Sequence, residues 1–170
     1  MPNIIEIQHI HSKESPREII AADFKSVGEL PIKGGWGYTK NDAVVIDKDD
    51  PINPIGIPFD GVSIEYIFVE KRIYEELIIF RPPNEGYSGI GWNLIKQKSD
   101  FLDGRRFDYL EFEVTALTDK DWEELKSIWE GSSGIQSPNF DQEAHKKEHE
   151  LRKVMYFAEY WFDISSFYDN

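Results

Sequence analysis

The sequence feature that most constrains the fold is the dipeptide Asp103-Gly104, because it favours a tight turn between two strands. Both residues tolerate the positive φ angles of a hairpin turn, and they separate residues 90–99 from residues 106–117. The second segment alternates: its buried-type positions are Leu110, Phe112, Val114 and Ala116, and between them lie Tyr109, Glu111, Glu113 and Thr115. This alternation predicts an antiparallel sheet with one buried face and one face open to water.

Two segments in the first half of the chain carry helical signals. Ser15 precedes Pro16 and is followed three residues later by Glu18, which is the pattern of a capping box. The apolar spacing after it predicts a helix over residues 16–27. Residues 61–80 are apolar around most of a helical circumference, so they predict a buried central helix. The β-branched and aromatic residues at the start of this segment also allow the alternative that its first part forms a strand.

Two more helices are expected in the second half. Thr118 is suited to cap a helix that ends at Gly131, and a connector over residues 131–139 follows. The last helix is predicted over residues 140–163, with a polar first half. Its second half places six apolar side chains at helical spacing: Leu151, Val154, Met155, Ala158, Trp161 and Phe162.

Strands are further expected over residues 3–10 and 43–46, and prolines interrupt regular pairing in much of the long segment 29–59. We therefore expect one domain over residues 1–170 of the α+β class. Its sheet is mostly antiparallel, with about four or five strands, and about four helices cover one face of it.

The charge excludes several classes of partner. The chain carries 32 Asp and Glu against 19 Lys and Arg, a formal net charge of −13. Such a charge repels phosphate backbones, so nucleic acid is not an expected partner. No apolar run approaches about 18 residues, so no membrane span is expected. The first residues lack the pattern of a secretory signal, which makes the cytoplasm the expected location.

Three groups of residues invite comparison with metal sites. His145, Glu148 and His149 match the letters of H-x-x-E-H, but their flanks are polar and a downstream ligand has little chain to come from. His9 and His11 share one face of the first strand without a third ligand. Residues 47–53 contain three aspartates, yet proline and isoleucine occupy EF-hand positions that need an oxygen ligand and glycine. We expect no metal and no other cofactor.

Glycines beside aromatic rings mark the most distinctive segments, residues 34–38 and 86–92. Glycine lets a ring lie against a ligand or another backbone, so the two segments are candidates for framing a groove. Their aromatic residues are Trp36, Tyr38, Tyr87 and Trp92. Arg72 joins these candidates as a receptor for a carboxylate, although its spacing to Glu76 also favours an internal ion pair.

No cysteine, serine motif or other local signature of catalysis is present, so no catalytic residue is expected. Acids are dense over residues 100–130, where Glu111 and Glu113 are candidates for contacting a basic partner. The first hypothesis is a non-enzymatic domain that docks a basic protein, as an inhibitor, antitoxin or immunity protein does. The alternatives are a small-ligand or peptide domain, or small enzyme, using the glycine–aromatic groove, and a structural protein that forms a homodimer through its C-terminal helix.

Overall fold

The computed structural model describes residues 2–131 and 141–168. Within them the elements follow in the order β1 (Asn3–Ile4), α1 (Pro16–Asp23), β2 (Ile32–Gly34), η1 (Lys40–Asp42), β3 (Val44–Ile46), α2 (Gly61–Tyr74), η2 (Glu75–Ile79), β4 (Tyr87–Leu102), β5 (Arg105–Thr118), α3 (Asp119–Gly131), α4 (Gln142–Arg152) and β6 (Val154–Asp163). Here η1 is a 3-10 turn and η2 is a π-helical turn.

The strands form one mixed sheet in the order β2-β3-β6-β5-β4, and β1 also pairs with β6. Strand β6 is antiparallel to β5 and parallel to both β1 and β3. The β2–β3 and β4–β5 pairs are antiparallel. The predicted α+β class is confirmed, although the described part of the sheet has six strands, of which β1, β2 and β3 are very short.

The long hairpin of β4 and β5 confirms the interpretation of Asp103-Gly104. These two residues have φ angles of 52° and 77°, as a tight hairpin turn requires. Leu102 pairs with Arg105 directly beside the turn. The strands are longer than predicted, because pairing continues from this turn as far as Tyr87 and Thr118.

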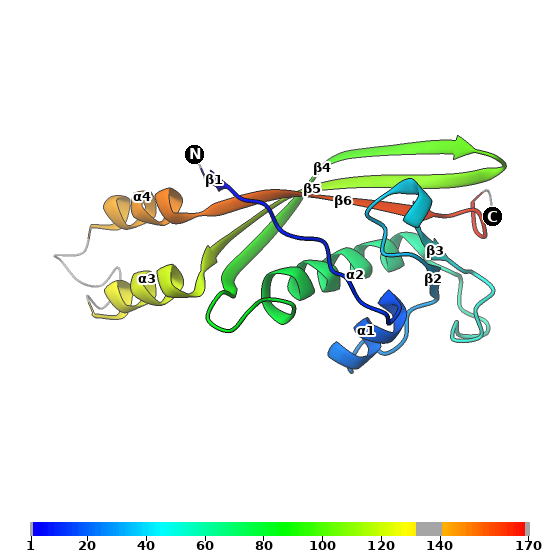
Figure 1. Ribbon diagram of the computed structural model, residues 1–170, viewed down its shortest axis with the longest axis horizontal. Helices are drawn as coiled ribbons and strands as arrows, with labels where there is room; N and C mark the ends of the chain where they lie inside the picture. The colour runs from blue at the N-terminus through cyan, green and yellow to red at the C-terminus, as the bar shows by residue number, and fades with distance from the viewer. Residues whose placement is uncertain (1, 132–140, 169–170) are drawn as a thin grey trace.

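The helices do not all cover one face, which corrects the predicted arrangement. Helices α1 and α2 lie on one face of the β4–β5–β6 sheet, while α3 and α4 extend beyond its end (Figure 1). Leu125 is the one buried residue of α3, and α4 has none. A helix with so little buried apolar surface cannot cover a sheet, so this pair projects as an arm.

The predicted helix over residues 140–163 is wrong in its second half. Helix α4 ends at Arg152, and residues 154–163 form the central strand β6. The apolar residues of this segment are compatible with both the helical and the strand periodicity. The buried positions are Tyr156, Ala158, Tyr160 and Phe162, which alternate as in a strand. Most of the helical surface expected to form a homodimer therefore does not exist.

The N-terminal elements are shorter than predicted. Of residues 3–10, only Asn3 and Ile4 pair as a strand, with β6. Helix α1 begins as expected, because the Ser15 hydroxyl accepts a hydrogen bond from the Glu18 amide at 3.2 Å. It ends at Asp23, four residues before the predicted end.

The helix expected over residues 61–80 is confirmed as α2 followed by η2. Asp60 caps it by accepting a hydrogen bond from the Ser63 amide at 3.0 Å. One stripe packs against the inner face of the sheet and forms the centre of the core: Phe68, Val69, Ile73 and Leu77 from the helix, with Leu110, Phe112, Val114, Tyr160 and Phe162 from the strands.

The helix predicted after Thr118 is also confirmed and reaches Gly131. Residues 132–139 of the predicted connector lie outside the described residues. No helix in the described ranges has the length and apolar character needed to cross a membrane.

Candidate functional site

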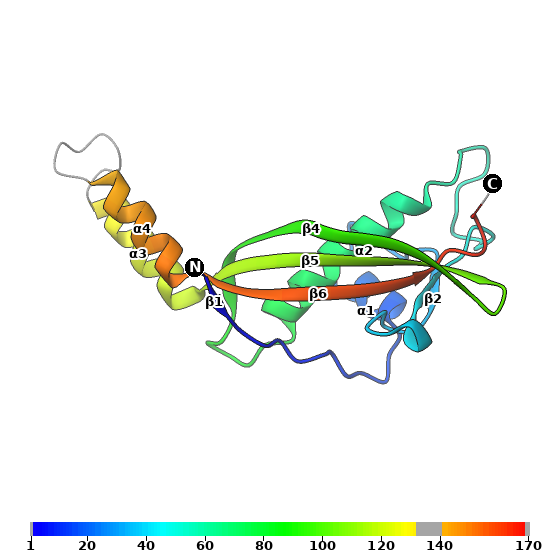
Figure 2. The same ribbon diagram turned by 90° about the horizontal axis from the view of Figure 1, so that it is seen from above.

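The outer surface of β5 and β6 carries no helix (Figure 2). We call it the open face and define it by the outward side chains Tyr109, Glu111, Glu113, Phe157, Glu159 and Trp161. The register places these residues opposite one another in three cross-strand pairs: Tyr109 with Trp161, Glu111 with Glu159, and Glu113 with Phe157. The open face thus combines carboxylates with aromatic rings, and Phe157 is 46% exposed.

The carboxylates of the open face form no ion pair among the described residues, although Lys96 of β4 lies opposite Glu111 in the register. Glu111 and Glu159 lie directly opposite each other, an arrangement in which like charges destabilise a sheet. Within residues 2–131 and 141–168, no ion pair involves Glu111, Glu113 or Glu159. Lys98 on β4 contacts rings instead, with its Nζ 5.0 Å from the centre of the Tyr109 ring. Glu111 thus lies between Lys96 on β4 and Glu159 on β6, and its repulsion with Glu159 is not relieved by an ion pair within the described residues.

The side chain of Tyr109 contacts residues on both β5 and β6. Its hydroxyl donates a hydrogen bond to Glu111 Oε2 at 3.3 Å, and its ring lies 4.8 Å from that of Trp161. Burial, followed by its interaction with Glu159, raises the pKa of Tyr109 above its ordinary value. The phenol stays neutral and adds no further negative charge to the open face.

A buried polar network lies on the other side of β6. Arg72, on α2, is fully buried, and its guanidinium donates to the Trp36 carbonyl at 2.8 Å and to Glu76 Oε1 at 3.0 Å. It also bonds the Tyr38 hydroxyl, and it lies 4.7 Å from the centres of the Trp36 and Tyr38 rings. The ion pair predicted between Arg72 and Glu76 is thus confirmed, and it is held between aromatic rings.

Glu76 is the centre of this network. Besides Arg72, it accepts hydrogen bonds from the hydroxyls of Tyr38 at 3.0 Å and Tyr156 at 3.1 Å. It lies in the wide π-helical turn η2, a type of turn that is frequent at functional sites. The neighbouring Glu75 is also buried, but within the described part of the chain neither of its carboxyl oxygens has a hydrogen-bond partner. Burial raises the pKa of Glu75 to about 8.

A cavity of about 110 Å³ opens at the edge of β6 beside Glu76. We call it the β6 cavity; its lining residues are Ile7, His9, Tyr38, Glu76 and residues 156–160. The His9 and Tyr38 rings stack at 3.7 Å with an interplanar angle of 6°. They also line a broader hollow of about 560 Å³ with residues 10–13, Trp36 and Asp42. The stacked pair therefore stands between two adjoining cavities.

The residues predicted for the glycine–aromatic groove separate into two places. Trp36, Tyr38 and Arg72 come together in the buried network. Tyr87 and Trp92 lie on β4, at the opposite end of the strand order from β2 and β3. There the ring of Trp92 packs against Tyr74, and Tyr87 lies under the Arg81 guanidinium. The two segments do not frame one groove.

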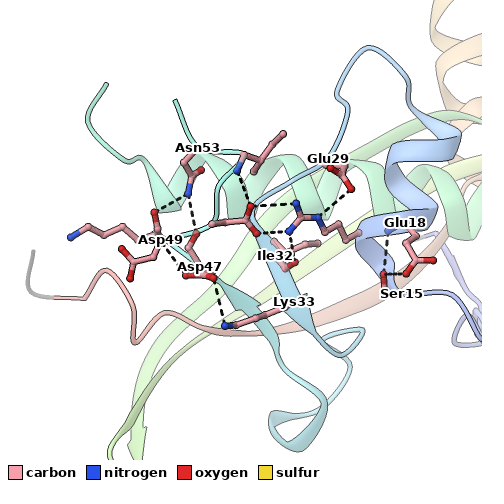
Figure 3. Close-up of polar contacts among 12 residues, drawn as sticks. Ser15, Glu18, Glu29, Ile32, Lys33, Asp47, Asp49 and Asn53 are labelled. Atoms are coloured by element: carbon pink, nitrogen blue, oxygen red, sulfur yellow. Dashed lines mark hydrogen bonds and ion pairs between the residues drawn. The ribbon is translucent and has the colours of Figure 1, made fainter. Parts of the chain in front are cut away.

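The acidic loop over residues 47–53 is tied to the protein itself. Figure 3 shows the side-chain amide of Asn53 donating to the carbonyls of Asp47 and Lys48, at 3.0 and 2.9 Å. The Asp47 carboxylate lies 3.5 Å from Lys33 Nζ, and Asp50 forms an ion pair with Arg17. The carboxylates of Asp47 and Asp50 thus stabilise the local fold.

The histidines of the H-x-x-E-H pattern lie on the projecting arm. His145 and His149 line a cavity with Trp122, Leu125, Lys126 and Trp129. Throughout the described residues, no group of three or more His, Asp or Glu side chains is placed to hold a metal ion.

Sequence reasoning missed the residues that complete the β6 cavity, namely Glu159, Tyr156 and Tyr160. Interpreting residues 154–163 as a helix obscured their alternation between the two faces of a strand. The aromatic-rich alternation itself was the available signal. Glu111 and Glu113, which were predicted, do lie on the open face.

Comparisons with protein-family models, with curated proteins and with solved structures find no match for this chain. The chemistry of the open face and of the β6 cavity is therefore what indicates a function.

Proposed function

We propose that this protein binds a basic protein partner through the open face, as a non-enzymatic inhibitor, antitoxin or immunity protein would. The observation that carries the proposal is the cross-strand pair of Glu111 and Glu159, next to Glu113, on a face without a helix. A cationic partner would offset the repulsion between these carboxylates. The fold tolerates here a like-charge arrangement that costs stability in the free protein.

The composition of the face also supports this proposal. Aromatic residues supply most of the binding energy at many interfaces, and here Phe157 and Trp161 lie beside the carboxylates. The net charge of −13 would steer a positively charged protein toward the molecule and speed the encounter. The open face thus has aromatic rings that can contribute binding energy and negative charges that can speed association with a basic partner.

The test begins by identifying the partner. A photo-crosslinking amino acid placed at Phe157, which is half-exposed, is used to capture the partner in an extract of the native host. The captured protein is then purified, and its Kd is measured at several salt concentrations. We expect a protein with a basic surface, and an affinity that falls as salt rises.

Two triple variants with the same change in charge isolate the open face. Glu111→Gln, Glu113→Gln and Glu159→Gln remove its carboxylates, whereas Glu123→Gln, Glu130→Gln and Glu143→Gln remove exposed carboxylates from the arm. The face triple should weaken binding at least about tenfold, and the arm triple should leave it nearly unchanged. Equal weakening by both triples, or a captured partner without a basic surface, would refute the proposal.

A further inference from the structure

We infer that the β6 cavity receives the guanidinium group of an arginine side chain presented by the partner. The source of the arginine rests on the proposed function, because Glu159 belongs both to the open face and to the cavity lining. The preference of the cavity for a guanidinium group follows independently from its own residues.

The cavity lining offers several hydrogen-bond acceptors, beside the His9 ring and the Tyr160 hydroxyl. Tyr38 and Tyr156 both donate their hydroxyl protons to Glu76, so the Tyr156 oxygen can only accept a further hydrogen bond. Glu76 is already paired with Arg72, so the charge left for a ligand is the carboxylate of Glu159, and among the described residues no lysine or arginine lines the cavity. A guanidinium group carries five N–H donors and no acceptor, so it complements this lining.

Tyr160 gives a second and separate indication of a ligand. It is 1% exposed and lines the cavity, yet its hydroxyl has no hydrogen-bond partner among the residues that the structure describes. Leaving a buried hydroxyl unsatisfied costs about 1–3 kcal/mol, so its presence in a well-packed core needs an explanation. A donor group in the cavity would satisfy it.

Size and access agree with this ligand. A water molecule takes roughly 30 Å³ in the liquid, so a cavity of about 110 Å³ has room for a small group such as guanidinium with part of its stem. Strand β6 pairs with β1 only up to Met155 and with β3 only from Phe162. The cavity lies in the interval between these two pairings.

The direct test uses a small probe and the intact protein. N-acetyl-arginine methylamide is titrated in NMR experiments that follow backbone amides, with the isosteric citrulline compound as the neutral control. We expect saturable shifts centred on residues 156–160 and His9 with the arginine probe, and none there with the citrulline probe. Equal shifts with both probes, or no saturable shift at these residues, would overturn the inference.

Three variants assign the interaction to the named atoms. Tyr160→Phe removes the unpartnered hydroxyl and Glu159→Gln removes the cavity charge; each should weaken probe binding about tenfold. Glu113→Gln lies on the open face outside the cavity and should leave probe affinity unchanged. An unaltered affinity in Tyr160→Phe, checked to be folded by its thermal unfolding, would contradict the assigned role.

The two proposals fail in different ways. If the probe does not bind but the face triple still weakens the partner, the cavity assignment is wrong and the docking surface stands. If the probe binds as expected but the face triple leaves the affinity for the partner unchanged, the docking surface is wrong. The cavity then binds a guanidinium group from another source, and the inference that the partner supplies the arginine is overturned.

Discussion

Three glutamates within one helical segment show how the surroundings of a residue decide its charge. Glu76 is buried among Arg72 and two tyrosine hydroxyls, which stabilise its carboxylate. Glu75 and Glu65 are buried without a cation of their own, and burial raises the pKa of each, to about 8 and about 9 respectively. At neutral pH burial therefore holds Glu75 and Glu65 mainly in the protonated form, whereas Glu76 has a cation and two hydroxyls as partners.

Removing Arg72 should be among the most damaging single changes. In Arg72→Met the Glu76 carboxylate stays buried without its cation, which typically costs about 3–5 kcal/mol of the free energy of unfolding. Arg72→Met combined with Glu76→Gln should recover part of this loss, because no buried charge remains. Urea unfolding measures all three proteins.

A matched change at a more exposed ion pair provides the control. Lys153→Met breaks a pair with Glu150, whose side chain is 59% exposed, so we expect a loss below about 1 kcal/mol. A double variant no more stable than Arg72→Met would show that the charge of Glu76 is not the source of the loss.

Glu65 should make stability depend on pH. Burial, its largest cause, and the nearby Asp108 raise the folded-state pKa of Glu65 to about 9, against an ordinary value of 4.5. Between these values the folded state binds a proton that the unfolded state has released. Its contribution to the free energy of unfolding therefore falls as pH rises from about 4.5 to about 9.

The variant Glu65→Gln keeps the shape and removes this titration. Relative to the wild type, it should gain stability as the pH rises, by up to about 1.4 kcal/mol per pH unit within the window. Thermal unfolding at a series of pH values measures the difference, with Glu130→Gln on the exposed arm as the control. A difference between Glu65→Gln and wild type that stays constant from pH 5 to pH 8 would contradict a raised pKa.

The sequence predicted the local part of this chemistry and not the distant part. Arg72 and Glu76 are four residues apart on one helix, so helical geometry alone pairs them. Tyr38 and Tyr156 reach Glu76 across separations of 38 and 80 residues. Only the order of strands in the sheet brings these groups together, and no spacing within the sequence encodes that order.

At the scale of elements, local signals succeeded where caps and turns act and failed where two periodicities compete. The capping box at Ser15 and the turn at Asp103-Gly104 use contacts between neighbouring residues, and both were predicted. Residues 154–163 satisfy helical and strand spacing alike, so their state depends on β5 being available beside them. Pairing with β5 favours the strand, a contribution that a local pattern does not contain.

A bulge in β4 anchors the arm to the sheet. Gly89 has φ of +60°, at a register shift between Ser88 and Gly91, and a Cβ placed on it would lie 2.9 Å from the Trp122 ring of α3. In Gly89→Ala we expect backbone strain of about 1–3 kcal/mol together with displacement of this ring. Thermal unfolding and tryptophan fluorescence measure the two effects.

The hairpin turn offers a control for the strain alone. Gly104 has φ of +77° and open space where a Cβ would lie, so Gly104→Ala carries strain without a clash. Gly89→Ala should be the more destabilising of the two, and it alone should change the fluorescence. Equal effects would show that Trp122 does not depend on the bulge.

At the scale of the whole molecule, the position of negative charge matters as well as its total. A net charge of −13 repels itself in the compact state, so added salt should stabilise the fold by screening. The face triple and the arm triple remove the same charge, but the face triple also removes the cross-strand repulsion of Glu111 with Glu159. It should therefore raise the Tm more at low salt.

Thermal unfolding of the two triples from low to high sodium chloride tests this expectation. The difference between them should shrink as salt rises, because screening acts on the repulsion that distinguishes them. Cross-strand pairs contribute roughly 0.2–1 kcal/mol each, which is measurable as a shift in Tm. A face triple no more stable than the arm triple at low salt would show that these carboxylates do not repel one another appreciably.

Among the described strands, β6 comes last in the sequence and nevertheless lies between β3 and β5. During translation, β1, β3 and β5 all leave the ribosome before β6, with which each of them pairs, is made. Until residue 163 has emerged, the β5 edge of the long hairpin and the β3 edge lack the strand that pairs with them. Completion of the sheet thus waits for β6, and a ribosome that stalls before β6 releases a species with open strand edges, the kind that chaperones bind and proteases remove.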